Sequence, residues 1–101
     1  MIEVIKISKA LSDPIRYKIM LMLLDYQSRE SSCCPSDLEG ACNCEIMAKF
    51  GMIQSRVSYH MKELTEAGLV IEEPKGKWKY YVLNLDTLKK YTEQLGADFE
   101  F

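Results

Sequence analysis

The strongest constraint on the fold of this chain lies in residues 41–70, ACNCEIMAKFGMIQSRVSYHMKELTEAGLV, which hold two helical patterns separated after Phe50. Ile46 and Phe50 lie one helical turn apart, and Gly51 is the residue type that ends a helix in the left-handed conformation. After this break, three apolar residues recur at the spacing of one helical face: Val57, Met61 and Leu64. The pattern predicts a helix-turn-helix over residues 42–67.

Two helices and a loop are predicted before this unit. Residues 2–11 form an amphipathic pattern with more apolar surface than a small monomer needs to bury. A second helix is expected from Pro14, with Ser12 or Asp13 as its cap. It is apolar nearly all round, which predicts a central buried position. Residues 26–40 are polar and without a period, so they predict a long loop.

A hairpin and a last helix are predicted after it. Ser55 is expected to cap the second helix of the unit. Residues 69–84 contain two strand patterns joined by turn residues, and alternation along the second strand directs one of Tyr80 and Tyr81 to the core and the other to the surface. A helix follows over residues 86–96. The fold class expected is mainly α with a small β-hairpin (α+β), in one domain over residues 1–101.

Composition limits the functions that such a domain performs. A chain of 101 residues with 48% hydrophobic and 28% charged residues is typical of one globular domain. No apolar run approaches the roughly 20 residues that span a bilayer, which predicts a cytoplasmic protein without membrane contact. The net charge of −2 argues against general affinity for nucleic acid, so any DNA-binding surface is expected to be local.

The outward face of the second helix of the unit has the chemistry of such a surface. Its residues are short, polar and able to form hydrogen bonds: Ser55, Ser58, Tyr59 and Lys62. Side chains of this kind suit base edges and phosphates when a helix lies in the major groove of double-stranded DNA. Lys75 and Lys77 give the hairpin a basic tip that is expected to contact phosphates beside the groove.

Four stretches of the chain resemble successive signature sequences of the ArsR/SmtB repressors: ALSDPIRYKIMLML, CNCEIMAKF, QSRVSYHMKELTEAGLV and GKWKYYVLN. The resemblance implies a winged helix-turn-helix with the hairpin at 69–84 as the wing. It also implies a homodimer held by the helices at 2–11 and 86–96, and repression of a resistance operon that an inducer relieves. The positions that match the family's DNA-contacting residues are Gln54, Ser55, Arg56, Ser58, Tyr59 and Lys62 on the helix and Lys75 and Lys77 on the wing.

The resemblance also suggests the inducer. In the arsenic- and cadmium-responsive branches of the family, a C-x-C pair begins the first helix of the helix-turn-helix, and Cys42-Asn43-Cys44 matches it. Thiolates select soft ions, and As(III) or Sb(III) is expected to bind three sulfur atoms. Residues i and i+2 of a regular helix do not face each other, so joint ligation by Cys42 and Cys44 is expected to distort the helix and weaken DNA binding.

The pair needs further ligands, and here the chain departs from the family. Met47 stands where one arsenical branch has a third cysteine, so Cys33 and Cys34 of the long loop are the candidates to complete the site. Two ligand sets stay open: three sulfurs for As(III) or Sb(III), or four thiolates for Cd(II), Pb(II) or Zn(II). The Asp/His zinc site that the family places on its last helix is not expected, because NLDTLKKYTEQL has no histidine.

Three other interpretations remain open. The cysteines are candidates for a thiol redox pair, in which one of Cys33 and Cys34 joins one of Cys42 and Cys44. The C-x-C residues are also candidates for plain burial, and the winged helix for protein interaction alone. His60, the one histidine of the sequence, is expected to pack or to contact phosphate rather than bind metal. Neither an enzyme nor an organic cofactor is expected, because no triad, phosphate-binding glycine loop or paired carboxylates are evident.

Overall fold

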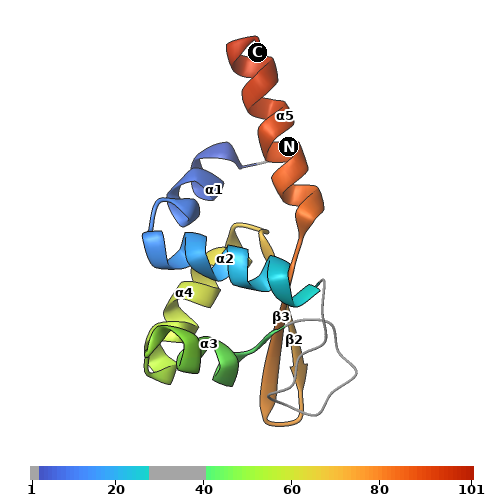
Figure 1. Ribbon diagram of the computed structural model, residues 1–101. Coiled ribbons are helices and arrows are strands. Elements are labelled where there is room, and N and C mark those ends of the chain that lie inside the picture. The colour runs from blue at the N-terminus through green and yellow to red at the C-terminus, as the bar shows by residue number, and fades with distance from the viewer. Residues whose placement is uncertain (1–2, 28–40) are drawn as a thin grey trace.

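The computed structural model describes residues 3–27 and 41–101, which form five helices and three short strands (Figure 1). In chain order the elements are α1 (Val4–Leu11), α2 (Pro14–Gln27), β1 (Ala41–Cys42), α3 (Asn43–Phe50), α4 (Gln54–Glu66), β2 (Val70–Lys75), β3 (Trp78–Leu83) and α5 (Leu85–Phe99). The predicted order of helices and hairpin is confirmed, and β1 is an addition to it. Most of the loop predicted at residues 26–40 lies outside the described residues.

Local signals explain where several helices begin. The Asp13 carboxylate accepts hydrogen bonds from the backbone N–H of Ile15 at 2.8 Å and of Arg16 at 3.4 Å, so Asp13 caps α2 as predicted. Burial raises the pKa of Asp13, but these two N–H donors, together with electrostatic contributions from His60 and Arg16, hold that pKa below its usual value. The prediction for α4 was wrong in its cap: the helix begins at Gln54, and Ile53 precedes it without a side-chain hydrogen bond.

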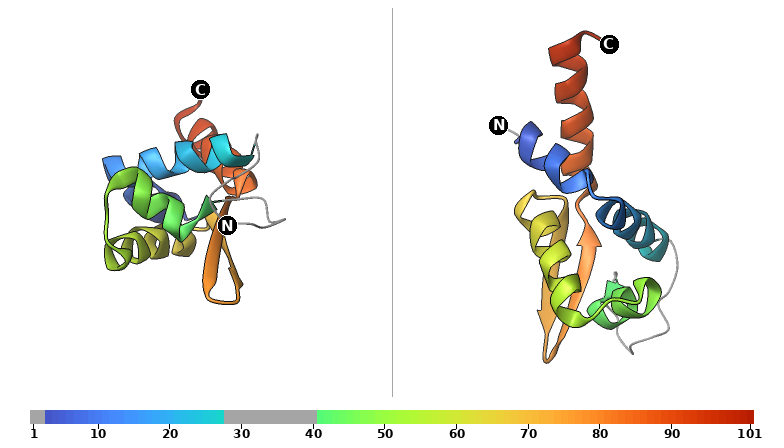
Figure 2. Two further views of the ribbon diagram at one scale, coloured as in Figure 1. Left: turned by 60° about the horizontal axis from the view of Figure 1, so that its bottom comes forward. Right: turned by 90° about the vertical axis from the view of Figure 1, so that its left-hand side faces the viewer.

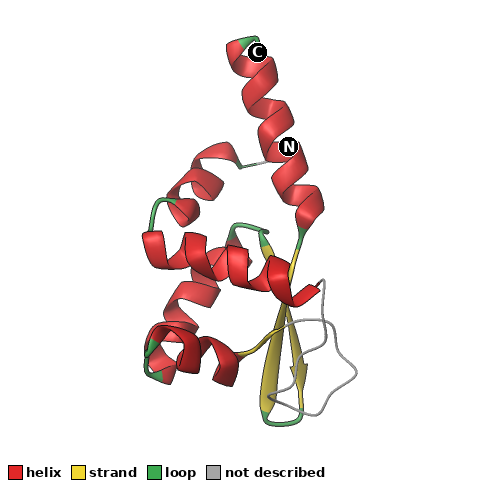
Figure 3. Cartoon of the chain, in the orientation of Figure 1, coloured by secondary structure: helices red, strands yellow, loops and turns green. Residues whose placement is uncertain are grey.

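The hairpin predicted over residues 69–84 is formed by β2 and β3, and a third strand pairs with it. The sheet has the strand order β1-β3-β2 and is antiparallel throughout (Figure 3). β2 continues through Pro74, which pairs with Lys79, because an edge strand accommodates a residue without an N–H. On the other side of β3, Ala41 pairs with Tyr81 and Cys42 with Tyr80. The sheet therefore joins the start of the helix-turn-helix to the hairpin.

The core lies where α1, α2, α3 and α4 pack together with the sheet. The apolar stripe predicted on α4 is confirmed, because its three members are buried: Val57, Met61 and Leu64. The prediction that α2 is buried on all sides was wrong, since one side of it leaves Tyr17, Leu21 and Leu24 about half exposed. Tyr80 and Tyr81 are both buried, so their predicted division between core and surface was wrong as well. Tyr80 is buried because it packs with Cys42, its partner on β1, and with Cys44 at the start of α3.

The last helix extends beyond the rest of the molecule. α5 projects from the body with α1 beside its first half, and the hairpin points to the opposite end (Figures 1 and 2). The Ser8 and Tyr91 hydroxyls are 2.7 Å apart and link the two helices. No residue of α5 is fully buried, and the aromatic rings of Phe99 and Phe101 at its end are exposed. The arrangement leaves an apolar surface on α5 that this chain alone does not cover.

Gly51 permits a test of the turn between α3 and α4. Its φ of 61° and ψ of 37° are left-handed, and a Cβ there would meet no atom within 4 Å. Replacing Gly51 with Ala is therefore expected to lower the free energy of unfolding by about 1 kcal/mol through backbone conformation alone. Gly51→Asn is the control and should lose less, because Asn tolerates this conformation. Equal losses in urea titrations of the two variants would contradict the explanation.

Candidate functional site

The residues predicted to contact DNA gather on one face of α4. Gln54, Ser55 and Arg56 occupy its first turn, followed by Ser58, Tyr59 and Lys62, and all six side chains are exposed. They lie opposite the buried stripe of the same helix, and the exposed fraction of the Tyr59 ring reaches 58%. α4 thus presents a polar, hydrogen-bonding surface that begins at its N-terminal end, where backbone N–H groups also favour anions.

The hairpin stands beside α4 (Figure 2). Its two strands are joined by Gly76 and Lys77, and Lys77 is exposed at the tip. Lys75 is the last residue of β2, so both lysines predicted for the wing are at the turn. The tip therefore has the position of a wing that flanks the surface of α4.

A groove of about 380 Å³ runs between α4 and the hairpin. It is lined by Ser58, Lys62, Thr65 and Glu66 of α4 and by Glu72, Lys79 and Tyr81 of the hairpin. Lys79 Nζ lies 3.7 Å from the Glu72 carboxylate, which also accepts a hydrogen bond from the Tyr81 hydroxyl at 3.4 Å. Burial and the Glu72 carboxylate raise the pKa of Tyr81 to about 12, so its hydroxyl remains a donor at neutral pH.

Sequence reasoning did not single out the hairpin side of this groove. Alternation along β3 places Lys79 and Tyr81 on one face, which was the signal available for them. That this face turns toward α4 depends on how helix and sheet pack, and no local pattern encodes it.

The two described cysteines are in direct contact. The Sγ atoms of Cys42 and Cys44 lie 2.7 Å apart, farther than the about 2.05 Å of a disulfide, so no disulfide joins the two residues. Cys42 is fully buried, whereas Cys44 is half-buried. The C-x-C motif thus presents two converging sulfur atoms, one of them reachable from solvent.

The premise that Cys42 and Cys44 both lie within a regular helix was wrong, and their sulfur atoms converge without a distorted helix. Cys42 precedes α3 in an extended conformation, with φ −70° and ψ 149°, and serves as its N-cap. Its Sγ accepts a hydrogen bond from the backbone N–H of Cys44 at 3.4 Å, while the Glu45 carboxylate accepts one from the backbone N–H of Cys42 at 3.1 Å. This reciprocal arrangement is a capping box with sulfur in place of a hydroxyl oxygen. An N-cap side chain folds back over the first turn, which brings the sulfurs together.

Further ligands for this pair are not found among the described residues. Within residues 3–27 and 41–101, no group of three or more His, Cys, Asp or Glu side chains is arranged to hold a metal ion. Cys33 and Cys34, the predicted remaining ligands, lie outside the described residues. Met47 packs against the hydrophobic core. The described part therefore brings together two of the four sulfur atoms that the sequence predicts as ligands.

His60 packs inside the protein, as expected, and binds Arg16 of α2. Its exposed fraction is 3%, and its Nδ1 lies 3.2 Å from Nη1 of Arg16. Burial lowers the pKa of His60, and the Arg16 and Arg56 guanidinium groups lower it further, while the Asp13 carboxylate acts in the opposite direction. His60 is therefore neutral at neutral pH.

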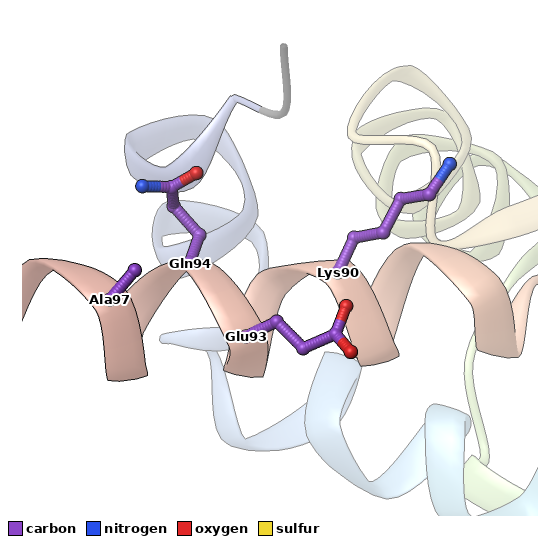
Figure 4. A pocket seen from close by; sticks show the side chains of 4 residues that line it. All are labelled: Lys90, Glu93, Gln94 and Ala97. Carbon is purple, nitrogen blue, oxygen red and sulfur yellow. The ribbon is translucent and has the colours of Figure 1, made fainter.

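A second hollow lies away from both of these surfaces. It measures about 280 Å³ and is lined along α5 by Lys90, Glu93, Gln94 and Ala97 (Figure 4). Its lining comes from a single helix, and it is an open depression rather than an enclosed ligand pocket. In the described part of the chain, no helix is both long and apolar enough to cross a membrane.

The helix-turn-helix followed by a hairpin and a terminal helix defines a winged helix-turn-helix domain. A homodimeric winged helix-turn-helix DNA-binding domain from Mycobacterium bovis, described as a possible ArsR-family regulator, superimposes with a TM-score of 0.67 at 23% identity. The match covers 94% of this chain and 78% of that one. Residues 38–72 also match the family model of bacterial regulatory proteins of the arsR family.

Two relatives from Bacillus subtilis (strain 168) agree with this match. The arsenical resistance operon repressor is 37% identical over 76 residues, which are 75% of this chain and 61% of the relative. The uncharacterized HTH-type transcriptional regulator YceK is 34% identical over 86 residues, which are 85% of this chain and 75% of the relative. The chain belongs to the arsR family of bacterial regulatory proteins, a family of transcriptional regulators rather than enzymes. It spans about three fifths of the length of the arsenical repressor it matches.

Proposed function

We propose that this protein is a cytoplasmic, homodimeric transcriptional repressor that binds operator DNA through α4 and the hairpin and releases it when As(III) or Sb(III) binds Cys42 and Cys44. The observation that carries the proposal is the 2.7 Å contact between the two sulfur atoms at the start of α3. The similarity to a B. subtilis arsenical resistance operon repressor supports the same inducer class.

The DNA-binding half of the proposal rests on the chemistry of one surface. Polar side chains of α4 suit base edges, and Lys62 and the lysines of the hairpin suit phosphates. The sequence has 15 acidic and 13 basic residues, so DNA binding depends on where the basic side chains lie rather than on the net charge. A dimer supplies two such surfaces for two half-sites about one helical turn apart. The exposed apolar residues of α1 and α5, such as Ile5 and Phe99, support these helices as the dimer interface.

The inducer half rests on the donor set. Two thiolates select soft ions over Mg²⁺ or Ca²⁺. A third sulfur from Cys33 or Cys34 completes the set for As(III) or Sb(III), and all four thiolates complete a set for Cd(II), Pb(II) or Zn(II). Each thiol that binds arsenite or antimonite gives its proton to a hydroxide of the ion, which leaves as water, whereas binding of Cd(II), Pb(II) or Zn(II) releases the thiol protons and strengthens as the pH rises.

The capping box supports a route from the thiols to the DNA-binding surface. Cys42 caps α3, and α3 leads through Gly51 directly into α4. Cys42 also pairs with Tyr80 in β3, which carries one side of the hairpin. An ion that takes the Cys42 sulfur as a ligand competes with the hydrogen bond that this sulfur accepts from Cys44 N–H. Ligation therefore acts at the junction of both DNA-binding elements, without requiring strain inside a regular helix.

A titration of the reduced protein tests the proposal. The operator is first obtained by selecting bound sequences from a random double-stranded DNA pool, and binding is then followed by fluorescence anisotropy. We expect stoichiometric arsenite or antimonite to release the DNA while a sulfur-to-metal absorption band appears. Release of the DNA by cadmium, lead or zinc, but not by arsenite or antimonite, would identify a divalent ion as the inducer. Release by peroxide alone would favour a thiol redox pair. Failure to select any DNA sequence would contradict the repressor function itself.

A further inference from the structure

A buried guanidinium connects three helices behind the DNA-binding surface. The Arg16 side chain, at the start of α2, is 6% exposed. Its Nε donates a hydrogen bond to the Ala10 carbonyl at 2.7 Å and its Nη2 to the Lys9 carbonyl at 3.5 Å, both near the end of α1. Its Nη1 donates to His60 Nδ1 on α4 at 3.2 Å. Arg16 thereby provides a donor for the Ala10 carbonyl and a further donor for the Lys9 carbonyl, which also accepts from the Ser12 N–H, at the end where the helix dipole favours a cation.

The hydrogen bond fixes the protonation state of His60. A guanidinium has donors and no acceptor, so Nδ1 of His60 must carry a lone pair and the ring proton must lie on Nε2. Nε2 is buried and has no hydrogen-bond partner among the described residues. A second proton on the ring would therefore replace the acceptor of Arg16 with a donor, and it would place two cations in contact inside the protein.

We propose that Arg16 is a positioning residue for operator recognition. Its hydrogen bonds to His60 and to the carbonyls of α1 hold α4 at the end of α1, a connection called the tie below, and protonation of His60 breaks it. The inference rests on the proposed DNA-binding function. Tyr59, whose exposed side chain belongs to the DNA-binding face, stands next to the pair: its ring centroid is 5.3 Å from that of His60 and 6.0 Å from Cζ of Arg16. A shift of the guanidinium or the imidazole therefore moves Tyr59 on the surface that contacts the bases.

The charges around His60 set the direction of the pH effect. Arg16 on α2 and Arg56 on α4 oppose its protonation, and Asp13 on α2 favours it, while α1 meets the pair through backbone carbonyls. Burial and the arginines prevail, so the pKa of folded His60 lies below the unfolded value of about 6.5. The free energy of unfolding is therefore highest above about pH 6.5 and declines as the pH falls below it. Operator affinity is expected to decline at lower pH, as the pH falls through the lowered pKa of folded His60, whereas added positive charge by itself would strengthen DNA binding.

Two variants test the tie. His60→Asn retains an acceptor near the position of Nδ1 and cannot be protonated, so it should bind operator as the wild type does at neutral pH and lose the acidic decline. Arg16→Met retains the apolar stem without the donors and should lose about tenfold in affinity at neutral pH, equivalent to about 1.4 kcal/mol. In the wild type, affinity should fall toward the value of Arg16→Met as the pH drops below the lowered pKa of folded His60, measured at constant ionic strength. Anisotropy measured on samples that circular dichroism reports as folded gives these values.

Ile19→Val on the same helix removes one buried methylene and leaves the polar contacts intact, so it should change stability without changing operator affinity or its pH profile. The inference is overturned if Arg16→Met binds operator like the wild type, or if His60→Asn keeps the wild-type pH profile.

A DNA-independent measurement separates this inference from the repressor function. Amide hydrogen exchange in α4 should be faster in Arg16→Met than in the wild type. In the wild type it should become faster at acidic pH, after correction for the pH dependence of the intrinsic exchange rates. Unchanged exchange rates in α4 would refute the tie even if no operator were found.

Discussion

Replacing Lys62 with Glu is expected to reduce operator affinity by about a hundredfold or more, because it removes one phosphate contact and places a negative charge in the groove between α4 and the hairpin. Lys62 is exposed on α4 and lines that groove together with Glu66 and Glu72. A carboxylate at position 62 would join two existing carboxylates at the surface that phosphates approach. The expected loss is therefore larger than that of the neutral variant Lys62→Ala.

Salt dependence separates a phosphate contact from a general charge effect. If Lys62 neutralises one phosphate, Lys62→Ala should reduce the slope of log affinity against log salt by about 0.9. Lys18→Glu is the matched control, because Lys18 is exposed on α2 and its reversal changes the net charge equally. The control should lose little affinity at physiological salt. Equal losses for Lys62→Glu and Lys18→Glu would refute the assignment of α4 as the DNA-binding helix.

Where patterns are local, the sequence was sufficient to predict the fold. The buried stripe of α4 follows from helical spacing, and the end of α3 follows from the conformational freedom of Gly51. The hairpin follows from strand patterns on either side of turn residues. These signals depend on neighbours within a few positions, which is why they placed the residues predicted to bind DNA on one exposed face before any packing was known.

The parts that escaped prediction depend on contacts between distant residues. β1 is two residues long, too short for a period, and it exists because Ala41 and Cys42 pair with β3. Without β1, Cys42 appeared to lie inside α3, and the contact between the sulfurs appeared to need a distorted helix. The Arg16–His60 hydrogen bond spans 44 positions and is likewise invisible to local patterns. The one sequence feature that pointed to this hydrogen bond was Arg16 itself, a charged residue at the start of the apolar helix α2.

Replacing either described cysteine is expected to remove the response to arsenite. Cys42→Ser and Cys44→Ser should each abolish arsenite-induced release of the operator while leaving operator affinity within about twofold of the wild type. The retained affinity follows from the capping box. Serine is a preferred N-cap residue, so Cys42→Ser keeps an acceptor for the Cys44 N–H and α3 remains formed. A hydroxyl oxygen, however, does not replace a thiolate as a ligand for a soft ion.

Two further variants make this prediction specific to the sulfur ligands. Cys42→Ala removes both the ligand and the cap, so it should also lower the free energy of unfolding by about 1 kcal/mol, which Cys42→Ser should not. Met47→Leu removes the thioether and preserves core packing, so it should respond to arsenite like the wild type. Release that persists in both serine variants would show that the inducer binds elsewhere. If Met47→Leu no longer releases DNA on addition of arsenite, the Met47 thioether is a ligand as well. Cys42 and Cys44 together with Cys33 or Cys34 would then not be sufficient to hold the ion.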